Sequence, residues 1–163
     1  MAVNLQTTGV HHIALRVTDV EKSKRFYTET LGFPVVAEFP GLVLFSAGSV
    51  VVGVRAPDEQ TPSGDSFSPF RVGLDHIALA CDDEAELERV ATALEEAGIW
   101  NTGTKLDDAL GKRYVAFKDP DGIKWEYYRS ERAAGLAEPV RSGCALRVQL
   151  ARNAIADRAF QAG

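Results

Sequence analysis

Residues 9–15 read Gly-Val-His-His-Ile-Ala-Leu, and residues 73–79 return to the same pattern as Gly-Leu-Asp-His-Ile-Ala-Leu. Each copy is followed by an acidic residue able to cap a helix, an apolar stripe at helical spacing, and a glycine (Gly32 or Gly98) placed to end the helix. A unit that occurs twice indicates an internal repeat. The sequence therefore predicts a strand–helix module followed by a second copy of it.

Each predicted helix is followed by short runs typical of strands. They cover residues 33–39, 42–47 and 50–55 in the first module and 99–103, 112–118 and 123–129 in the second, where the Asp-Pro-Asp-Gly of 119–122 forms a tight turn. We therefore predict an α+β fold of two βαβββ modules, at about 9–55 and 73–129. A linker rich in Pro, Ser and Gly, 56–71, joins them and is able to close over a site. The modules form one domain over 1–130, and residues 131–163 are a C-terminal extension with a helix over 146–160.

Alternation along the first strand of each module separates two faces. Residues two apart share a face, so His12 lies with Ala14, and His76 lies with Ala78. These small residues leave open space above each histidine. The opposite apolar faces are expected to pack on the helices, and His11, assigned to that side of its strand, is interpreted as structural.

The last predicted strand adds a carboxylate to the open face. Glu126 shares its face of the strand with Lys124 and Tyr128, whereas Trp125 belongs to the opposite, apolar face. Two imidazoles and a carboxylate form a common ligand set for Fe, Zn, Ni or Mn, and they leave positions for water and substrate. The residues alone leave two interpretations open: a metal site, or packed histidines beside a solvated carboxylate.

Further motifs accompany the histidine strands. They are Phe26-Tyr27, Leu31-Gly32-Phe33, and residues 117–122 followed by Glu126. In combination these motifs resemble the vicinal oxygen chelate superfamily, which includes glyoxalase I, methylmalonyl-CoA epimerase, extradiol dioxygenases, fosfomycin-modifying enzymes and bleomycin resistance proteins. The resemblance covers residues 9–130. It implies paired βαβββ modules, each curled around a cleft, and a divalent metal ion (Fe, Ni, Mn or Zn) bound by His12, His76 and Glu126.

The chain also departs from patterns in that superfamily. Many members have a fourth ligand, Glu or Gln, in the last strand of the first module, and alignment of residues 48–52 with 122–126 puts Val52 there. Only a shifted alignment would reach Glu38. Because glyoxalase I uses an acid at that place for proton transfer, its chemistry lacks a base here. Ala116 stands where extradiol dioxygenases have a tyrosine, which counts against ring cleavage.

The expected function is that of a divalent-metal-dependent enzyme of lyase, isomerase or transferase type, acting on a small molecule with vicinal oxygens. Arg16, Lys124 and Tyr128 are candidates for substrate contacts because alternation places them on the cleft face, and the catalytic residues are left open. Arg16, Arg113 and Lys124 are the evident cations for a phosphonate, and each is equally compatible with a surface charge. The alternatives are an extradiol-type dioxygenase and a non-catalytic ligand-binding protein of the bleomycin resistance type.

Length and charge set the remaining expectations. The 163 residues carry 18 Lys and Arg against 23 Asp and Glu, a formal net charge of −5, which argues against a nucleic-acid partner. Neither a signal peptide nor a run of about 20 apolar residues is evident, so no membrane association and a cytoplasmic location are expected. Cys81 and Cys144 are interpreted as reduced thiols. The resemblance implies a homodimer, in which many members share the metal site between chains.

Overall fold

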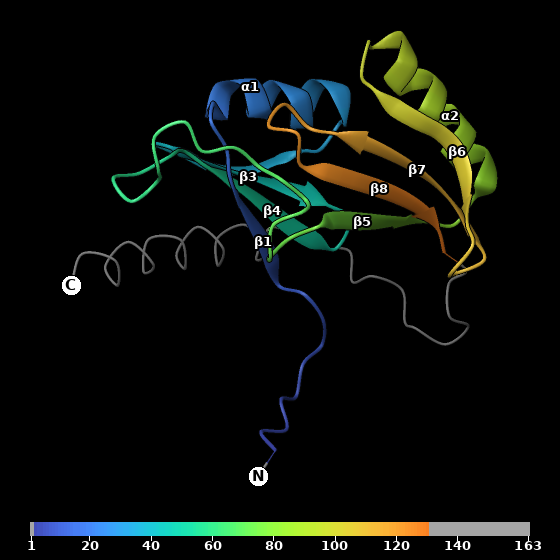
Figure 1. Cartoon of the computed structure of the whole chain (residues 1–163), viewed down its shortest axis with the longest axis horizontal. Coiled ribbons are helices and arrows are strands. Elements are labelled where there is room, and N and C mark those ends of the chain that lie inside the picture. Colours follow the sequence, from blue (N-terminus) through green and yellow to red (C-terminus); the bar gives the residue numbers. More distant parts are fainter. Residues whose placement is uncertain (1, 131–163) are drawn as a thin grey trace.

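Two four-stranded sheets, each with helical structure packed on one face, make up the computed structural model, which describes residues 2–130 (Figure 1). The elements are β1 (His12–Arg16), α1 (Val20–Arg25), the π-helical turn η1 (Phe26–Thr30), β2 (Val35–Phe39), β3 (Leu42–Ala47), β4 (Val50–Arg55), β5 (His76–Cys81), α2 (Glu84–Glu96), β6 (Asn101–Asp107), β7 (Lys112–Lys118) and β8 (Lys124–Arg129). The predicted α+β class and the repeated βαβββ module are confirmed. The expected helix at 146–160, and Cys144, lie outside the described residues.

The two sheets have the same topology. Their strand orders are β1-β4-β3-β2 and β5-β8-β7-β6, and in each the first strand pairs in parallel with the last. In both, the strand that follows the helix carries a register shift, between Val35 and Ala37 in β2 and between Asn101 and Thr104 in β6. Equivalent positions of the two modules can therefore be compared directly by strand register.

The helices begin where the sequence predicts and differ in how they continue. Asp19 and Asp83 cap α1 and α2 through their side chains, as their positions before the apolar stripes suggest. The first helix is not a uniform α-helix up to Gly32, because it passes into the π-helical turn η1, where Phe26 and Tyr27 are both buried. Gly32 then adopts a φ of 71°, a left-handed conformation that favours glycine.

One apolar core joins the modules on their helix side. Side chains from both sheets form a single buried cluster, in which Tyr27 and Trp125 meet edge-on with ring centroids 5.7 Å apart. The Tyr27 hydroxyl also donates to Asp119 Oδ2 at 2.8 Å, and Asp119 Oδ1 accepts the backbone N–H of Ile123. The turn after β7 is thus bonded to the first module. The sheet faces opposite the helices remain available for a site.

The linker runs along the first module before the chain enters β5. Phe67 of the linker packs against the core, and a cavity of about 350 Å³ lies between the linker and β1. Cys81, at the end of β5, is a free and buried thiol, and burial raises the pKa of that thiol. Within residues 2–130, no helix combines the length and apolar character needed to cross a membrane.

Candidate metal centre

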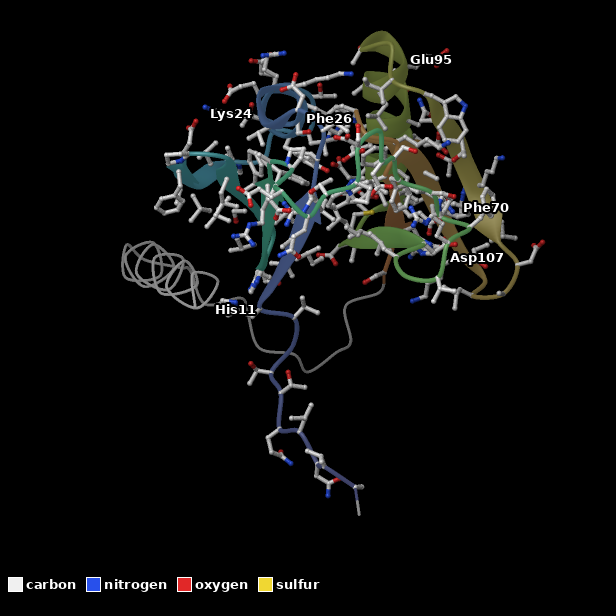
Figure 2. All side chains as sticks on the ribbon, turned by 60° about the vertical axis from the view of Figure 1, so that its left-hand side comes forward. His11, Lys24, Phe26, Phe70, Glu95 and Asp107 are labelled. Atoms are coloured by element: carbon white, nitrogen blue, oxygen red, sulfur yellow. The ribbon has the colours of Figure 1, made fainter. Side chains whose placement is uncertain are left out.

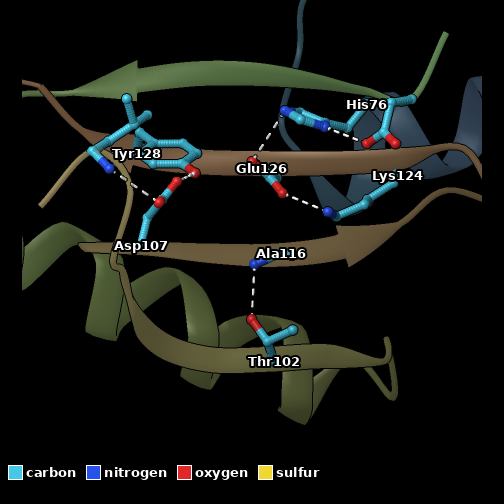
Figure 3. Close-up of polar contacts among 9 residues, drawn as sticks. His76, Thr102, Asp107, Ala116, Lys124, Glu126 and Tyr128 are labelled. Atoms are coloured by element: carbon cyan, nitrogen blue, oxygen red, sulfur yellow. Dashed lines mark hydrogen bonds and ion pairs between the residues drawn. The ribbon is translucent and has the colours of Figure 1, made fainter. Parts of the chain in front are cut away.

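His76 and Glu126 come together on the face of the second sheet that the helix does not cover. β5 and β8 run in parallel, with His76 opposite Lys124 and Ala78 opposite Glu126. The two side chains converge over this pair of strands, with His76 Nε2 3.3 Å from Glu126 Oε2 (Figure 3). Two of the three predicted metal ligands are therefore neighbours.

The carboxylate of Glu126 is buried, and only one of its two oxygens accepts a hydrogen bond. The residue is only 3% exposed, and its Oε1 accepts from Lys124 Nζ at 2.6 Å. This bond raises the pKa of Lys124. Oε2 accepts no hydrogen bond, and its polar neighbour is His76 Nε2 at 3.3 Å, which forms an ion pair with it only when the imidazole is protonated. A buried carboxylate oxygen without a partner is costly, and a bound cation would satisfy it.

His76 directs its Nε2 at that oxygen. Its Nδ1 lies 2.6 Å from Asp75 Oδ1, and this hydrogen bond is the main cause that lowers the pKa of Asp75. An ionised carboxylate only accepts, so Nδ1 carries a proton, and in the neutral ring the lone pair is then on Nε2, the atom that faces Glu126 Oε2. A carboxylate bonded to the second nitrogen is also the usual arrangement around a metal-bound histidine.

The spacing of the two acceptors fits a single divalent ion. With metal–ligand distances of about 2.0–2.2 Å, two ligands at octahedral or tetrahedral angles lie about 2.8–3.6 Å apart. The 3.3 Å between His76 Nε2 and Glu126 Oε2 falls in this interval. A nitrogen and a carboxylate oxygen suit Fe, Zn, Ni or Mn.

His12 does not join this pair within one chain. It lies on β1 in the other sheet, and no three His, Cys, Asp or Glu side chains of residues 2–130 gather into a metal-binding group. The interpretation of His11 as a helix-facing structural residue is wrong. His11 precedes β1, is exposed, and places its Nδ1 2.8 Å from His12 Nδ1 at the end of the strand (Figure 2).

The register of the first sheet corrects the position assigned to a fourth ligand. Gly53, not Val52, is the counterpart of Glu126, because Gly53 lies opposite Ala14 as Glu126 lies opposite Ala78. Val52 is fully buried in the core. The expectation that this position offers no side-chain ligand still holds, since glycine has none.

A leucine occupies the space beside Gly53. Leu44 is its cross-strand neighbour, and a Cβ built on Gly53 would lie 2.9 Å from Leu44 Cδ2. In the second sheet the equivalent neighbours are Glu126 and the small Ala116. The shifted alignment through Glu38 also fails, because Glu38 is bonded to Lys24 of α1 at 2.7 Å, on the helix side.

The three candidates for substrate contacts are each bonded to a carboxylate. Arg16 forms an ion pair with Asp58 at 2.7 Å and so attaches the linker to β1. Lys124 is bonded to Glu126, and the Tyr128 hydroxyl donates to Asp107 Oδ2 at 2.6 Å. Lys124 and Tyr128 flank Glu126 on β8 (Figure 3). Arg113 binds Glu84 and Glu88 of α2, away from this face.

A stacked pair of tyrosines next to Glu126, which forms an aromatic wall of the site, was not predicted from the sequence. Tyr114 of β7 lies opposite Tyr128, and their rings stack with centroids 5.0 Å apart. Alternation back from Ala116 would have identified Tyr114. Ala116 is held in turn by Thr102, whose Oγ1 accepts the Ala116 N–H at 2.9 Å where β6 departs from regular pairing. The face beside Glu126 is thus polar and aromatic.

Comparison with known proteins places these features in context. Residues 9–127 match the family model described as the Glyoxalase/Bleomycin resistance protein/Dioxygenase superfamily. The uncharacterised protein YwkD of Bacillus subtilis (strain 168) is 34% identical over 74% of this chain and 95% of its own length. Catechol-2,3-dioxygenase of the same organism is 28% identical over 68% of this chain and 41% of its own.

Solved structures share the fold. The crystal structure of lactoylglutathione lyase from Agrobacterium tumefaciens superposes with a TM-score of 0.63 and 25% identity. The superposition covers 78% of this chain and 98% of that protein. The names of these relatives differ in the reaction they describe, so the similarity alone does not select one.

Proposed function

Because the chain belongs to the glyoxalase/bleomycin resistance protein/dioxygenase superfamily, we propose that it is a divalent-metal-dependent enzyme acting on a small molecule with vicinal oxygens. The reaction proposed is of lyase, isomerase or transferase type. The observation that carries this proposal is the buried Glu126 Oε2, which accepts no hydrogen bond and lies 3.3 Å from His76 Nε2. Two acceptors at that distance suit a shared cation.

The third ligand in this proposal is the His12 of a second copy of the chain. His12 has the same register position in the first sheet as His76 in the second, opposite Val51 and Lys124 respectively. It is exposed, and in its own chain it does not join His76 and Glu126. A twofold-symmetric homodimer would pair each first sheet with the second sheet of its partner and form two equal sites.

A bound divalent ion would polarise vicinal oxygens of the substrate and stabilise an oxyanion. Different residues of the chain have different roles around this ion. Lys124 neutralises one oxygen of Glu126 while the other remains free for the ion. The stacked Tyr114 and Tyr128 form an aromatic wall beside the site, and Gly53 and Leu44 supply an apolar surface from the first sheet.

The second candidate is an extradiol-type dioxygenase, favoured by the 28% identity to catechol-2,3-dioxygenase. Two histidines and one carboxylate are the ligand set of non-heme Fe(II) oxygenases. Against it stands Ala116, buried opposite Glu126, in place of the tyrosine of that group. We therefore rank it second. If no metal binds, the remaining candidate is a non-catalytic ligand-binding protein. We propose a cytoplasmic location in every case.

Metal analysis tests the proposal. The purified protein is stripped by chelation, reconstituted separately with Fe(II), Ni(II), Mn(II) and Zn(II), and compared with His76→Ala and Glu126→Ala. We expect about one ion per chain in the wild type and loss of it in both variants, because each removes a ligand. Glu96→Ala, an exposed carboxylate on α2, is the matched control and keeps the ion. No binding of any ion by the wild type would overturn the metal-enzyme proposal.

A further inference from the structure

In both modules, the residue before the strand histidine contacts the same ring nitrogen of that histidine, Nδ1. Asp75 Oδ1 lies 2.6 Å from His76 Nδ1, and His11 Nδ1 lies 2.8 Å from His12 Nδ1. These two pairs stand at equivalent places, where β5 and β1 begin. Both modules therefore engage Nδ1 of the strand histidine and leave Nε2 free of this contact.

The tautomer of a histidine decides whether Nε2 can bind a metal. A neutral imidazole carries one proton, so Nε2 has a lone pair only when the proton is on Nδ1. The Asp75 carboxylate only accepts, and so it holds the proton of His76 on Nδ1. The imidazole of His11 is able to donate or accept, so the His11–His12 bond permits either tautomer of His12.

We propose that Asp75 is a positioning residue for the metal, which locks His76 in the binding tautomer before an ion arrives. His11 exerts no such lock, so His12 is a mixture of tautomers without the ion and is held wholly in the Nδ1–H form only when Nε2 binds it. This inference rests on the proposed function. It makes His76 and Glu126 a preformed half-site within one chain, and His12 the ligand that is added second.

Nitrogen NMR of the metal-free protein tests the lock directly. The chain has 3 histidines, so the ring nitrogens of an untagged, ¹⁵N-labelled sample in EDTA can be assigned individually. At pH 8.5 we expect one tautomer for His76, with the proton on Nδ1, and a mixture for His12. Asp75→Ala should release the Nε2–H form of His76, and Asp75→Asn should give a mixture of the two forms, because its amide can present either an acceptor oxygen or a donor nitrogen to Nδ1.

Metal affinity, measured by competition with a chelator for the wild-type ion, supplies the second readout. Loss of a carboxylate bonded to a ligand histidine costs about 10- to 100-fold in affinity, so we expect this loss in Asp75→Ala. Asp75→Asn should lie between Asp75→Ala and the wild type, because only one orientation of its amide holds the proton on Nδ1. Glu96→Ala removes one negative charge from the exposed surface of α2 and should match the wild type.

The outcomes separate this inference from the proposed function. Wild-type metal binding with unchanged affinity in Asp75→Ala, or an Nε2–H tautomer of His76 in the wild type, overturns the positioning role and leaves the metal site intact. A wild type that binds none of the ions overturns the proposed function. In that case the tautomer of His76 in Asp75→Ala still decides whether Asp75 positions the ring.

Discussion

At the scale of single residues, the bond between Tyr27 and Asp119 holds the two modules together. Both side chains are buried, and Asp119 also accepts from two backbone N–H groups of its own turn. Burial raises the pKa of the Asp119 carboxyl, while the Tyr27 hydrogen bond acts to lower it. The tyrosine hydroxyl therefore stabilises a carboxylate that its surroundings disfavour.

Tyr27→Phe should lower the free energy of unfolding by about 1–3 kcal/mol at pH 7, because it leaves a buried carboxylate oxygen without its donor. Urea unfolding followed by circular dichroism measures this difference. The matched control is Tyr114→Phe, which removes a hydroxyl that takes no part in the bond between the modules. Equal stability of Tyr27→Phe and the wild type would show that the bond contributes nothing.

The same variant has a defined dependence on pH. An acid whose pKa is raised on folding binds its proton more tightly in the native state, so its ionisation destabilises that state as the pH rises from the unfolded pKa through the folded one. Without Tyr27 the folded pKa of Asp119 rises further. The deficit of Tyr27→Phe should therefore be smallest at acid pH, below the raised folded pKa of Asp119, where the carboxyl is protonated in both proteins, and grow as the pH rises through that pKa. A deficit that shrinks with rising pH would contradict this assignment.

At the scale of strands, the first sheet has a small residue where the second sheet has a large one, and a large residue where the second has a small one. The second sheet pairs Glu126 with Ala116, and the first pairs Gly53 with Leu44. In each pair one large side chain covers the small residue across from it. The arrangement accounts for the missing carboxylate of the first module, since Leu44 fills the space that such a side chain would need.

Gly53→Glu should therefore destabilise the fold by about 1–3 kcal/mol through overpacking against Leu44. Adding Leu44→Ala should relieve part of this overpacking. The double variant should therefore lose less unfolding free energy than the two single variants lose together, by about 0.5–3 kcal/mol. Thermal unfolding of the four proteins closes the cycle. If the two losses simply add, Leu44 does not fill the space that the Gly53→Glu side chain needs. Gly53→Ala serves as the reference for the smallest side chain at this position.

The strand predictions succeeded where turn residues separate one run of strand-forming residues from the next. The bounds of β3, β4 and β7 are those of the predicted runs at 42–47, 50–55 and 112–118. β6 begins two residues later than predicted, because the N–H of Ile99 bonds back to Leu94 O and so belongs to the end of α2. A strand start is hard to predict where a helix cap still uses the backbone.

The candidate site was predictable to the same extent. Alternation inside β5 and β8 correctly places His76 and Glu126 on one face. It assigns His11 to the wrong side, since alternation does not apply before the first residue of β1. The roles of Asp75 and Tyr114 depend on side-chain contacts across or outside strands, which a periodic pattern does not contain.

At the scale of the molecule, the helix-side core binds the two modules to each other and leaves the ligand-bearing faces apart. Tyr27, Trp125 and Asp119 connect the modules within one chain. His12 and the pair of His76 and Glu126 stay in separate sheets. A complete three-ligand site in the proposed enzyme therefore requires two chains, which makes dimerisation a condition for metal binding.

Complementation between inactive variants tests this condition. His12→Ala and Glu126→Ala each destroy both sites of a homodimer, but in a mixed dimer one site receives both mutations and the other receives neither. Random association of equal amounts gives mixed dimers in about half of the population, so about a quarter of wild-type metal content should return. The variants are unfolded together, refolded, and analysed for bound metal, with each variant refolded alone as the control. If His12 binds the ion within its own chain, neither kind of chain carries a complete set and the mixture stays as empty as its components.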